Sequence, residues 1–257
     1  MKKMIVTSLA LGVCSIGLMA GNAMAYPLDS GSESSLQEVL DNITQATASN
    51  PSGLSSVNVQ YDFVAPEIDD YWAIGGTGQS AATLVIEITA GALTNTFGVY
   101  DYSDISKKVT LFNGPATPGV FPGFKTSLSF LLDGSVILNN TLDSGVDFAG
   151  NNFGFFLGVG NKFYYSDITK NADNFDHMFA YEGKGDLVQL PGVLPGEWLS
   201  NEYVLGWEDG ANGGDKDYQD FVVMVESITP VPEPATMLLF GTGLAGLAGL
   251  VTRRKKN

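Results

Sequence analysis

Ten short apolar segments, separated by turn-forming residues, occupy the chain between residues 57 and 226. Segments of four to eight residues match the usual length of a β-strand and are too short for a typical helix. Gly, Asn, Asp and Pro lie between them and favour turns. The expected strands are 57–63, 82–89, 96–100, 108–112, 135–138, 153–159, 177–181, 187–190, 203–207 and 221–226. This pattern predicts an all-β fold, an antiparallel sandwich or jelly roll that forms a single domain over residues 57–230.

One short helix is expected before the strands. Ser35 and Glu38 have the Ser-x-x-Glu spacing of a capping box, and apolar residues follow at helical spacing. Residues 44–56 are rich in Ser, Thr, Asn, Pro and Gly and predict a loop. Residues 26–56 therefore form a helix and loop that lead into the domain. Helices and strands do not alternate along the chain, which argues against a doubly wound nucleotide-binding fold.

The first 25 residues have the pattern of a secretory signal peptide. Lys2 and Lys3 precede an apolar run over residues 4–20, and Ala23-Met24-Ala25 offers small residues to signal peptidase. The mature chain then starts at Tyr26. The alternative is a retained anchor helix. Cys14, the single cysteine, would leave with the signal, so the mature chain would have neither a thiol nor a disulfide.

Acidic residues dominate the chain between Tyr26 and Pro230. This part holds 27 Asp and Glu residues and 7 Lys residues, an excess of 20 negative charges. Such a body repels phosphate backbones, which excludes nucleic acid as an expected partner, and it attracts divalent cations.

The C-terminal end combines three features in a fixed order. Val231-Pro-Glu-Pro-Ala235 is followed by the uncharged, mostly apolar residues 237–251 and then by the basic residues Arg253, Arg254, Lys255 and Lys256. The apolar stretch is somewhat shorter than the roughly 20 residues that cross a bilayer. By itself the pattern indicates a stop-transfer anchor with the basic end in the cytoplasm.

This order also resembles the PEP-CTERM sorting signal of Gram-negative bacteria. The resemblance covers residues 231–257 and implies a transmembrane sorting helix with a basic tail. It further implies recognition by an exosortase, cleavage near Pro232-Glu233-Pro234, transient anchoring in the inner membrane, and delivery to the cell surface or the exopolysaccharide matrix.

Five carboxylates lie between two apolar strands: Glu208, Asp209, Asp215, Asp217 and Asp220. The intervening glycines allow the backbone to fold tightly, and Ca²⁺ takes six to eight oxygen ligands in irregular geometry. Like charges this close also repel one another unless a cation neutralises them. The spacing is not that of an EF-hand. A solvated acidic turn is the alternative to a calcium site.

The same loop resembles the terminal signature of the domain-of-unknown-function family 4114. Trp207-Glu208-Asp209 and, after a glycine-rich gap, Asp215-Lys-Asp217-Tyr-Gln-Asp220 carry the resemblance. It implies calcium binding within a β-sandwich over roughly residues 57–229, with Asp101 of the strand at 96–101 as a more distant contributor. Trp207, Tyr218 and Gln219 depart conservatively from the family's residues, and Gln219 would reach a metal differently from Asn.

Other candidate sites are weaker. His177 is the single histidine, which excludes a multi-histidine zinc site and favours a structural role. A Ser-His-Asp triad would need this residue, and the sequence has no Gly-x-Ser-x-Gly motif. Paired carboxylates for glycoside hydrolysis stay open, because acidic residues are too abundant to single out a pair.

One aromatic motif and one glycine motif complete the candidates. Asp69-Asp70-Tyr71-Trp72 sets rings beside carboxylates, as sugar-binding sites do, although Trp72 is also expected as a core residue at a strand start. Gly75-Gly76-Thr77-Gly78 lacks the lysine and strand-to-helix setting of a phosphate loop and predicts a turn.

Taken together, these features lead us to expect an exported, surface-sorted protein without catalysis. Its role would be that of a structural or adhesive component of the extracellular polysaccharide (biofilm) matrix, stabilised by calcium. The alternatives are a lectin-like carbohydrate-binding module that recognises exopolysaccharide and, less favoured, a polysaccharide-processing enzyme.

Overall fold

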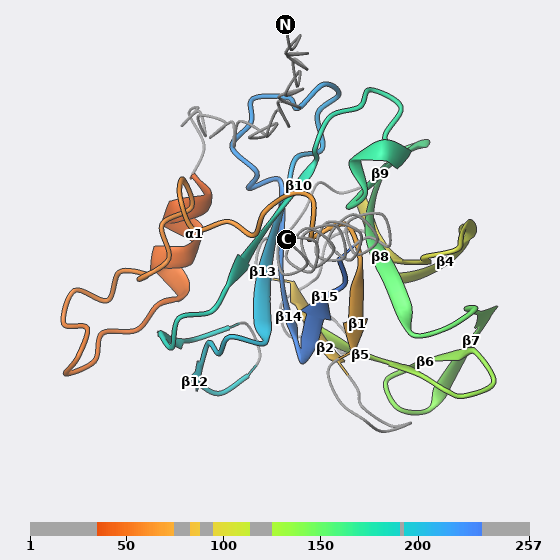
Figure 1. Ribbon diagram of the computed structural model, residues 1–257. Coiled ribbons are helices and arrows are strands. Elements are labelled where there is room, and N and C mark those ends of the chain that lie inside the picture. Colours follow the sequence, from red (N-terminus) through yellow and green to blue (C-terminus); the bar gives the residue numbers. More distant parts are fainter. Residues whose placement is uncertain (1–34, 75–82, 88–94, 114–124, 191–192, 233–257) are drawn as a thin grey trace, which may run out of the picture.

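Two antiparallel sheets pack face to face (Figure 1). The computed structural model describes residues 35–74, 83–87, 95–113, 125–190 and 193–232. Among these residues, one sheet has six strands, in the order β15 (Ile228–Pro230), β1 (Trp72–Ile74), β8 (Asn152–Val159), β3 (Asn95–Asp101) and β4 (Asp104–Asn113), with β9 (Lys162–Tyr165) beside β8. The predicted all-β antiparallel fold is confirmed.

The second sheet has seven strands in the described part of the chain. Their order is β10 (Met178–Glu182), β13 (Glu202–Trp207), β14 (Phe221–Glu226), β2 (Thr83–Glu87), β5 (Lys125–Phe130), β6 (Ser135–Leu138) and β7 (Leu142–Asp147). A short ribbon of β11 (Leu187–Val188) and β12 (Gly196–Glu197) lies outside both sheets. A 3-10 turn, η1 (Ile168–Lys170), follows β9.

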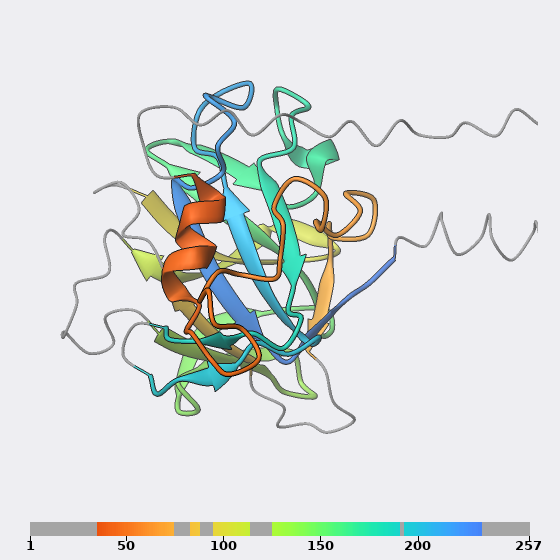
Figure 2. The same cartoon turned by 90° about the vertical axis from the view of Figure 1, so that its left-hand side faces the viewer.

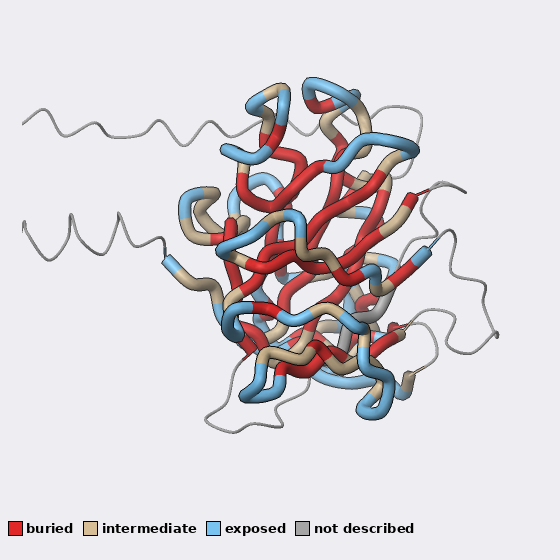
Figure 3. Tube along the Cα trace, turned by 90° about the vertical axis from the view of Figure 1, so that its right-hand side faces the viewer, coloured by how far each residue is buried: buried red, intermediate tan, exposed pale blue. Residues whose placement is uncertain are grey.

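Aromatic side chains fill the space between the two sheets. The ring of Phe97 on β3 stacks on Phe155 of β8, with 5.6 Å between ring centroids. It also meets rings from the opposite sheet, Trp207 at 5.8 Å and Phe221 at 5.1 Å. All four side chains are buried. Offset and edge-on aromatic pairs add to the free energy gained by burial alone, so these rings help to fix how the sheets pack. In Figure 3 the buried residues follow the strands, and the exposed residues lie mainly in the loops between them.

The helix α1 (Leu36–Ile43) covers the outer face of the seven-stranded sheet (Figure 2). Its four apolar residues, Leu36, Val39, Leu40 and Ile43, are buried there in one cluster with side chains of β10, β13 and β14. The predicted cap is present, because the Ser35 hydroxyl accepts a hydrogen bond from the Glu38 N–H at 3.3 Å. The predicted helix and the loop after it are therefore confirmed.

The predicted strand at residues 57–63 was wrong. Val57 and Val59 alternate inward as in a strand, and both are buried. However, their backbone is bound by the Gln37 side chain, which donates to the Val57 carbonyl and accepts from the Val59 N–H, both at 3.1 Å. An amide of α1 thus takes the place of a partner strand.

Several strands were not predicted, for two reasons. β1 and β15 have only three residues each, too few to show a period. β5 and β7 are rich in Ser, Thr and Asp, and β7 is largely exposed at a sheet edge. A polar edge strand carries little apolar alternation.

Trp72 lies on β1 with its side chain 0% exposed, packed edge-on against Tyr203 at 4.8 Å. It is a core residue, so it cannot act as the exposed aromatic of a sugar-binding site.

Other predictions fall on residues outside those described. They concern the signal peptide at 1–25, the turn at Gly75 to Gly78 and the sorting helix at 237–251. Within the described residues, no helix combines the length and the apolar character needed to cross a membrane.

Candidate metal centre

The acidic loop, residues 208–220, connects β13 to β14. Its two ends are held together because Trp207 and Phe221 pair across the strands at its base and are both buried in the core. This pairing brings the residues directly after β13 next to those directly before β14. Carboxylates that are far apart along the loop can therefore meet above the hairpin.

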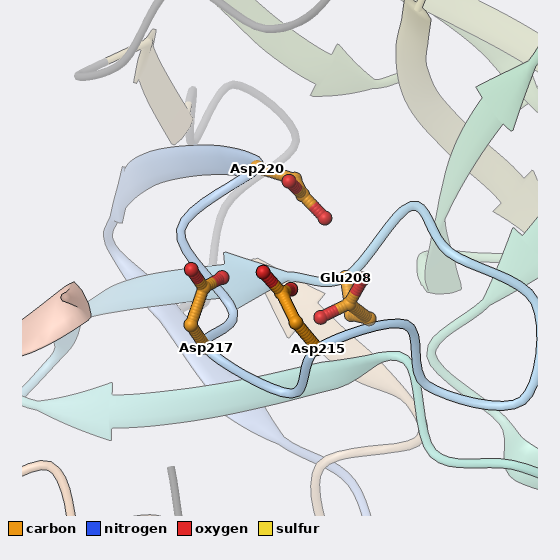
Figure 4. A group of neighbouring side chains, drawn as sticks. All are labelled: Glu208, Asp215, Asp217 and Asp220. Carbon is orange, nitrogen blue, oxygen red and sulfur yellow. The ribbon is translucent and has the colours of Figure 1, made fainter. Parts of the chain in front are cut away.

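Four of the five predicted carboxylates do meet. Glu208, Asp215, Asp217 and Asp220 each offer one carboxylate oxygen, and these oxygens all lie within 4.8 Å of one another (Figure 4). Calcium–oxygen distances are about 2.3–2.6 Å, so ligands on opposite sides of an ion are about 5 Å apart. The spacing of the four oxygens suits one such ion between them.

Glu208 is the most firmly held of the four. Its side chain is 1% exposed, and its two oxygens accept the backbone N–H groups of Gly210 at 3.0 Å and Lys216 at 2.9 Å. A Cβ on Gly214 would lie 2.1 Å from Glu208 Oε1. Glycine at 214 is thus required for the loop to approach the carboxylate.

Asp217 is buried without full hydrogen bonding. The residue is 1% exposed, and Oδ1 accepts the Gln219 N–H at 3.2 Å. Its Oδ2 is also buried and has no hydrogen-bond partner. An unpaired buried carboxylate oxygen is costly, and a cation is the partner that best offsets the cost.

The electrostatics of the loop favour a positive ligand. Burial, together with the nearby carboxylates of Glu208 and Asp209, raises the pKa of Asp220 to about 8. Burial also raises the pKa of Asp217, together with the charges of Asp215 and Glu208. At 4.8 Å two carboxylates repel by roughly 1 kcal/mol in water and roughly 3 kcal/mol near a protein surface. Because Asp215 is exposed, the lower figure applies to its pairs.

The carboxylates of Asp209 and Asp101 have other partners. The Asp209 carboxylate accepts a hydrogen bond from Asn95 Nδ2 at 3.0 Å, and Asp209 is not in the group of four. Asn95 begins β3 and Asp101 ends it, so Asp101 lies roughly 20 Å away along the strand at about 3.3 Å per residue. The Asp101 carboxylate instead accepts N–H groups of Ser103 at 2.7 Å and Ala149 at 2.5 Å.

The backbone of the acidic loop is strained. Asn212, Lys216 and Tyr218 have φ values of +57°, +64° and +55°. Positive φ values are unfavourable for residues other than glycine, and residues that adopt them are often found at functional sites. The buried Tyr218 is held in this conformation by its hydroxyl, which donates to the Asp176 carbonyl at 2.8 Å.

Both ring nitrogens of His177 form hydrogen bonds that hold the acidic loop in place. Its Nδ1 lies 2.9 Å from the Glu208 carbonyl oxygen, and its Nε2 lies 3.1 Å from Asp173 Oδ2. That same Asp173 oxygen accepts the Asn212 N–H at 2.9 Å. The ring is buried and stacks on Tyr164 with 3.7 Å between centroids. The structural role expected for His177 is thus tied to the first part of the acidic loop, from Glu208 to Asn212.

Sequence reasoning missed a second pair of buried carboxyls, Asp69 and Asp176. Asp176 Oδ1 accepts the Met178 N–H at 3.2 Å, and Asp69 accepts the Ala180 N–H, so both bind N–H groups of β10. Burial raises the pKa of Asp176 to about 7, and burial and the charge of Asp176 raise the pKa of Asp69. No local sequence signal marks the pair, because its members are more than a hundred residues apart.

Comparisons with known proteins agree with the two resemblances. The family described as Domain of unknown function (DUF4114) matches residues 135–228, and the PEP-CTERM protein-sorting motif matches residues 230–255. The chain carries a DUF4114 region followed by a PEP-CTERM sorting motif. The DUF4114 match spans the strands from β6 to β14 and includes the whole acidic loop.

The sorting motif indicates an exported, surface-sorted protein that is processed by an exosortase, as is typical of Gram-negative bacteria. Its match starts at Pro230, the last residue of β15, and so begins where the last strand of the described residues ends. No curated protein and no solved structure matches the chain.

Proposed function

We propose that this PEP-CTERM protein is a non-catalytic structural or adhesive component of the extracellular polysaccharide matrix, and that one Ca²⁺ ion stabilises its acidic loop. Glu208, Asp215, Asp217 and Asp220 are the proposed side-chain ligands, and Asp209 is not one of them. The observation that carries the calcium site is the buried, unpartnered Oδ2 of Asp217 within this group of carboxylates.

The chemistry of the four ligands favours calcium over other common ions. All are hard carboxylate oxygens. Zinc sites, by contrast, usually include nitrogen or sulfur ligands, and this group has neither. The loop arrangement is irregular, which calcium tolerates better than magnesium does. The ion would join Glu208 at the end of β13 to Asp220 at the start of β14, and so close the loop.

The matrix role rests on sorting and charge. A surface-sorted protein with an excess of 20 negative charges between residues 26 and 230 would repel anionic polymers unless cations intervene. Outside the cell, calcium is available to neutralise part of this charge. Calcium binding would therefore both stabilise the fold and allow contact with a polysaccharide.

Thermal unfolding of the exported chain in EGTA and in millimolar Ca²⁺ tests the calcium site. With a micromolar Kd, millimolar calcium adds about 4 kcal/mol to the free energy of unfolding. Asp217→Asn should remove most of this gain. The matched control Asp209→Asn changes a carboxylate of the same loop that lies outside the group, and it should keep the gain. Equal calcium gains in the two variants would contradict the assignment.

Co-sedimentation with purified exopolysaccharide tests the role. The exported chain should sediment with the polymer in calcium and less so in EGTA, without shortening it. Release of new reducing ends during the incubation would instead show a polysaccharide-processing enzyme.

A further inference from the structure

A pocket of about 190 Å³ lies between two turns at one end of the six-stranded sheet, where β3 ends and β8 begins. One wall is the turn from β3 to β4, with Asp101, Tyr102 and Ser103. The other wall is the connection from β7 to β8, residues 149–152. The pocket is at the opposite end of β3 from the acidic loop, so it is separate from the proposed calcium site.

Its framework is held rigid by a buried carboxylate. Asp101 is 1% exposed, and its Oδ1 accepts both the N–H and the hydroxyl of Ser103, at 2.7 and 2.8 Å. Its Oδ2 accepts the Ala149 N–H from the opposite wall at 2.5 Å. The Tyr102 N–H also donates across the pocket to the Asn152 carbonyl at 3.3 Å. The two walls are therefore fixed before any ligand arrives, which lowers the entropic cost of binding.

The lining offers neutral polar groups and one aromatic ring. Asn151 and Asn152 supply side-chain amides, and neither amide is hydrogen-bonded to another side chain or backbone group among the described residues. The Tyr102 ring packs edge-on against Tyr71, with 4.5 Å between centroids, which fixes its orientation. Gly150 leaves the rim open, since a Cβ there would meet nothing within 4 Å.

We propose that this pocket, named here the Tyr102–Asn152 pocket, binds one neutral sugar unit of a polysaccharide. A pyranose has an apolar face of C–H groups that suits an aromatic ring, and a rim of hydroxyls that can both donate to and accept from amides. The Asp101 carboxylate, the one charged group in the lining, already accepts three hydrogen bonds from protein groups. The pocket therefore offers a ligand mainly neutral polar groups. The acidic surroundings disfavour uronic acids and other anionic sugars. This inference rests on the proposed matrix role and names the chemical class that the protein would recognise there.

Saturation-transfer NMR with the exported chain tests the pocket, with glucose, galactose, mannose and N-acetylglucosamine and their short oligosaccharides as probes. At least one neutral sugar should bind, and glucuronic acid should bind more weakly. Asn152→Ala should raise the Kd roughly three- to tenfold, as expected for loss of a hydrogen bond. Tyr102→Ala should abolish binding. The matched controls are Asn113→Ala, an exposed Asn at the end of β4, and Tyr61→Ala, an aromatic that is 71% exposed in a different loop.

The outcomes separate this pocket from the calcium site. The pocket is supported if sugar binding persists in EGTA and in Asp217→Asn. It is supported further if Tyr102→Ala loses sugar binding and still gains stability from calcium. Chemical-shift changes in Asn152→Ala spectra report whether the fold survives. Absence of binding by every neutral sugar, or equal binding by Asn152→Ala and Asn113→Ala, overturns it, while the calcium result stands on its own.

Discussion

Replacing Gly214 by Ala should weaken calcium binding through a single contact. The residue has φ +35°, and an added Cβ would lie 2.1 Å from Glu208 Oε1 and 2.8 Å from Glu208 Cδ. Cβ atoms essentially never approach other atoms closer than 3.0 Å, so either the carboxylate or the loop must move. The positive φ alone costs about 1–2 kcal/mol for Ala. Displacing Glu208 should add to this and raise the Kd for calcium at least tenfold, or about 1.4 kcal/mol of binding free energy.

Gly160→Ala is the matched control for this change. Gly160 has φ +59° in the turn from β8 to β9, and a Cβ there would meet nothing within 4 Å. Both variants should therefore lose the backbone contribution in EGTA, measured by chemical denaturation. Only Gly214→Ala should also lose part of the calcium gain. If the two variants keep the same calcium gain, Glu208 is not a ligand and the reasoning from the close contact is refuted.

Two further predictions concern pH and the helix. Asp220 has a folded pKa of about 8, above the value near 4 expected in the unfolded chain, so its contribution to stability is full below about pH 4 and is lost as pH rises toward 8. In EGTA the melting temperature should therefore fall between pH 5 and 8, and Asp220→Asn should flatten the fall; a slope left unchanged by this variant would place the effect at Asp69 and Asp176. Leu36→Ala should cost about 3 kcal/mol of unfolding free energy, measured with denaturant, because the Leu36 side chain is buried between α1 and the seven-stranded sheet. The control Leu132→Ala changes a side chain that is 80% exposed and should alter stability by less than about 0.5 kcal/mol. Similar losses in both variants would mean that α1 does not pack on the sheet.

The pattern of apolar residues predicted most of the longer strands. Strands β6 and β14 were predicted with their observed bounds, because each is an apolar run with a clear end. The segment at residues 57–63 shows why the same signal failed elsewhere. Its alternation reflects burial against α1, and only the distant side chain of Gln37 decides that it is not a strand. Long-range hydrogen bonds of this kind leave no local pattern.

The candidate site was predicted only in part, because its contacts also depend on residues that are distant in the sequence. Five carboxylates on one loop mark the place, but the sequence cannot tell which of them converge. Asp209 is adjacent to Glu208, yet its carboxylate turns to Asn95 on the other sheet. The Tyr102–Asn152 pocket joins two turns about fifty residues apart, and neither turn shows a motif by itself. Its walls become apparent only once β3 and β8 are paired.

The position of calcium in crystals of the exported chain tests the metal centre most directly. An anomalous difference map from crystals grown in calcium should show one peak about 2.3–2.6 Å from oxygens of Glu208, Asp215, Asp217 and Asp220. The same crystals soaked in EGTA should lose the peak. A loop with no peak among these four carboxylates in millimolar calcium would contradict the account, and so would a peak that only Asp209 or another acidic group contacts.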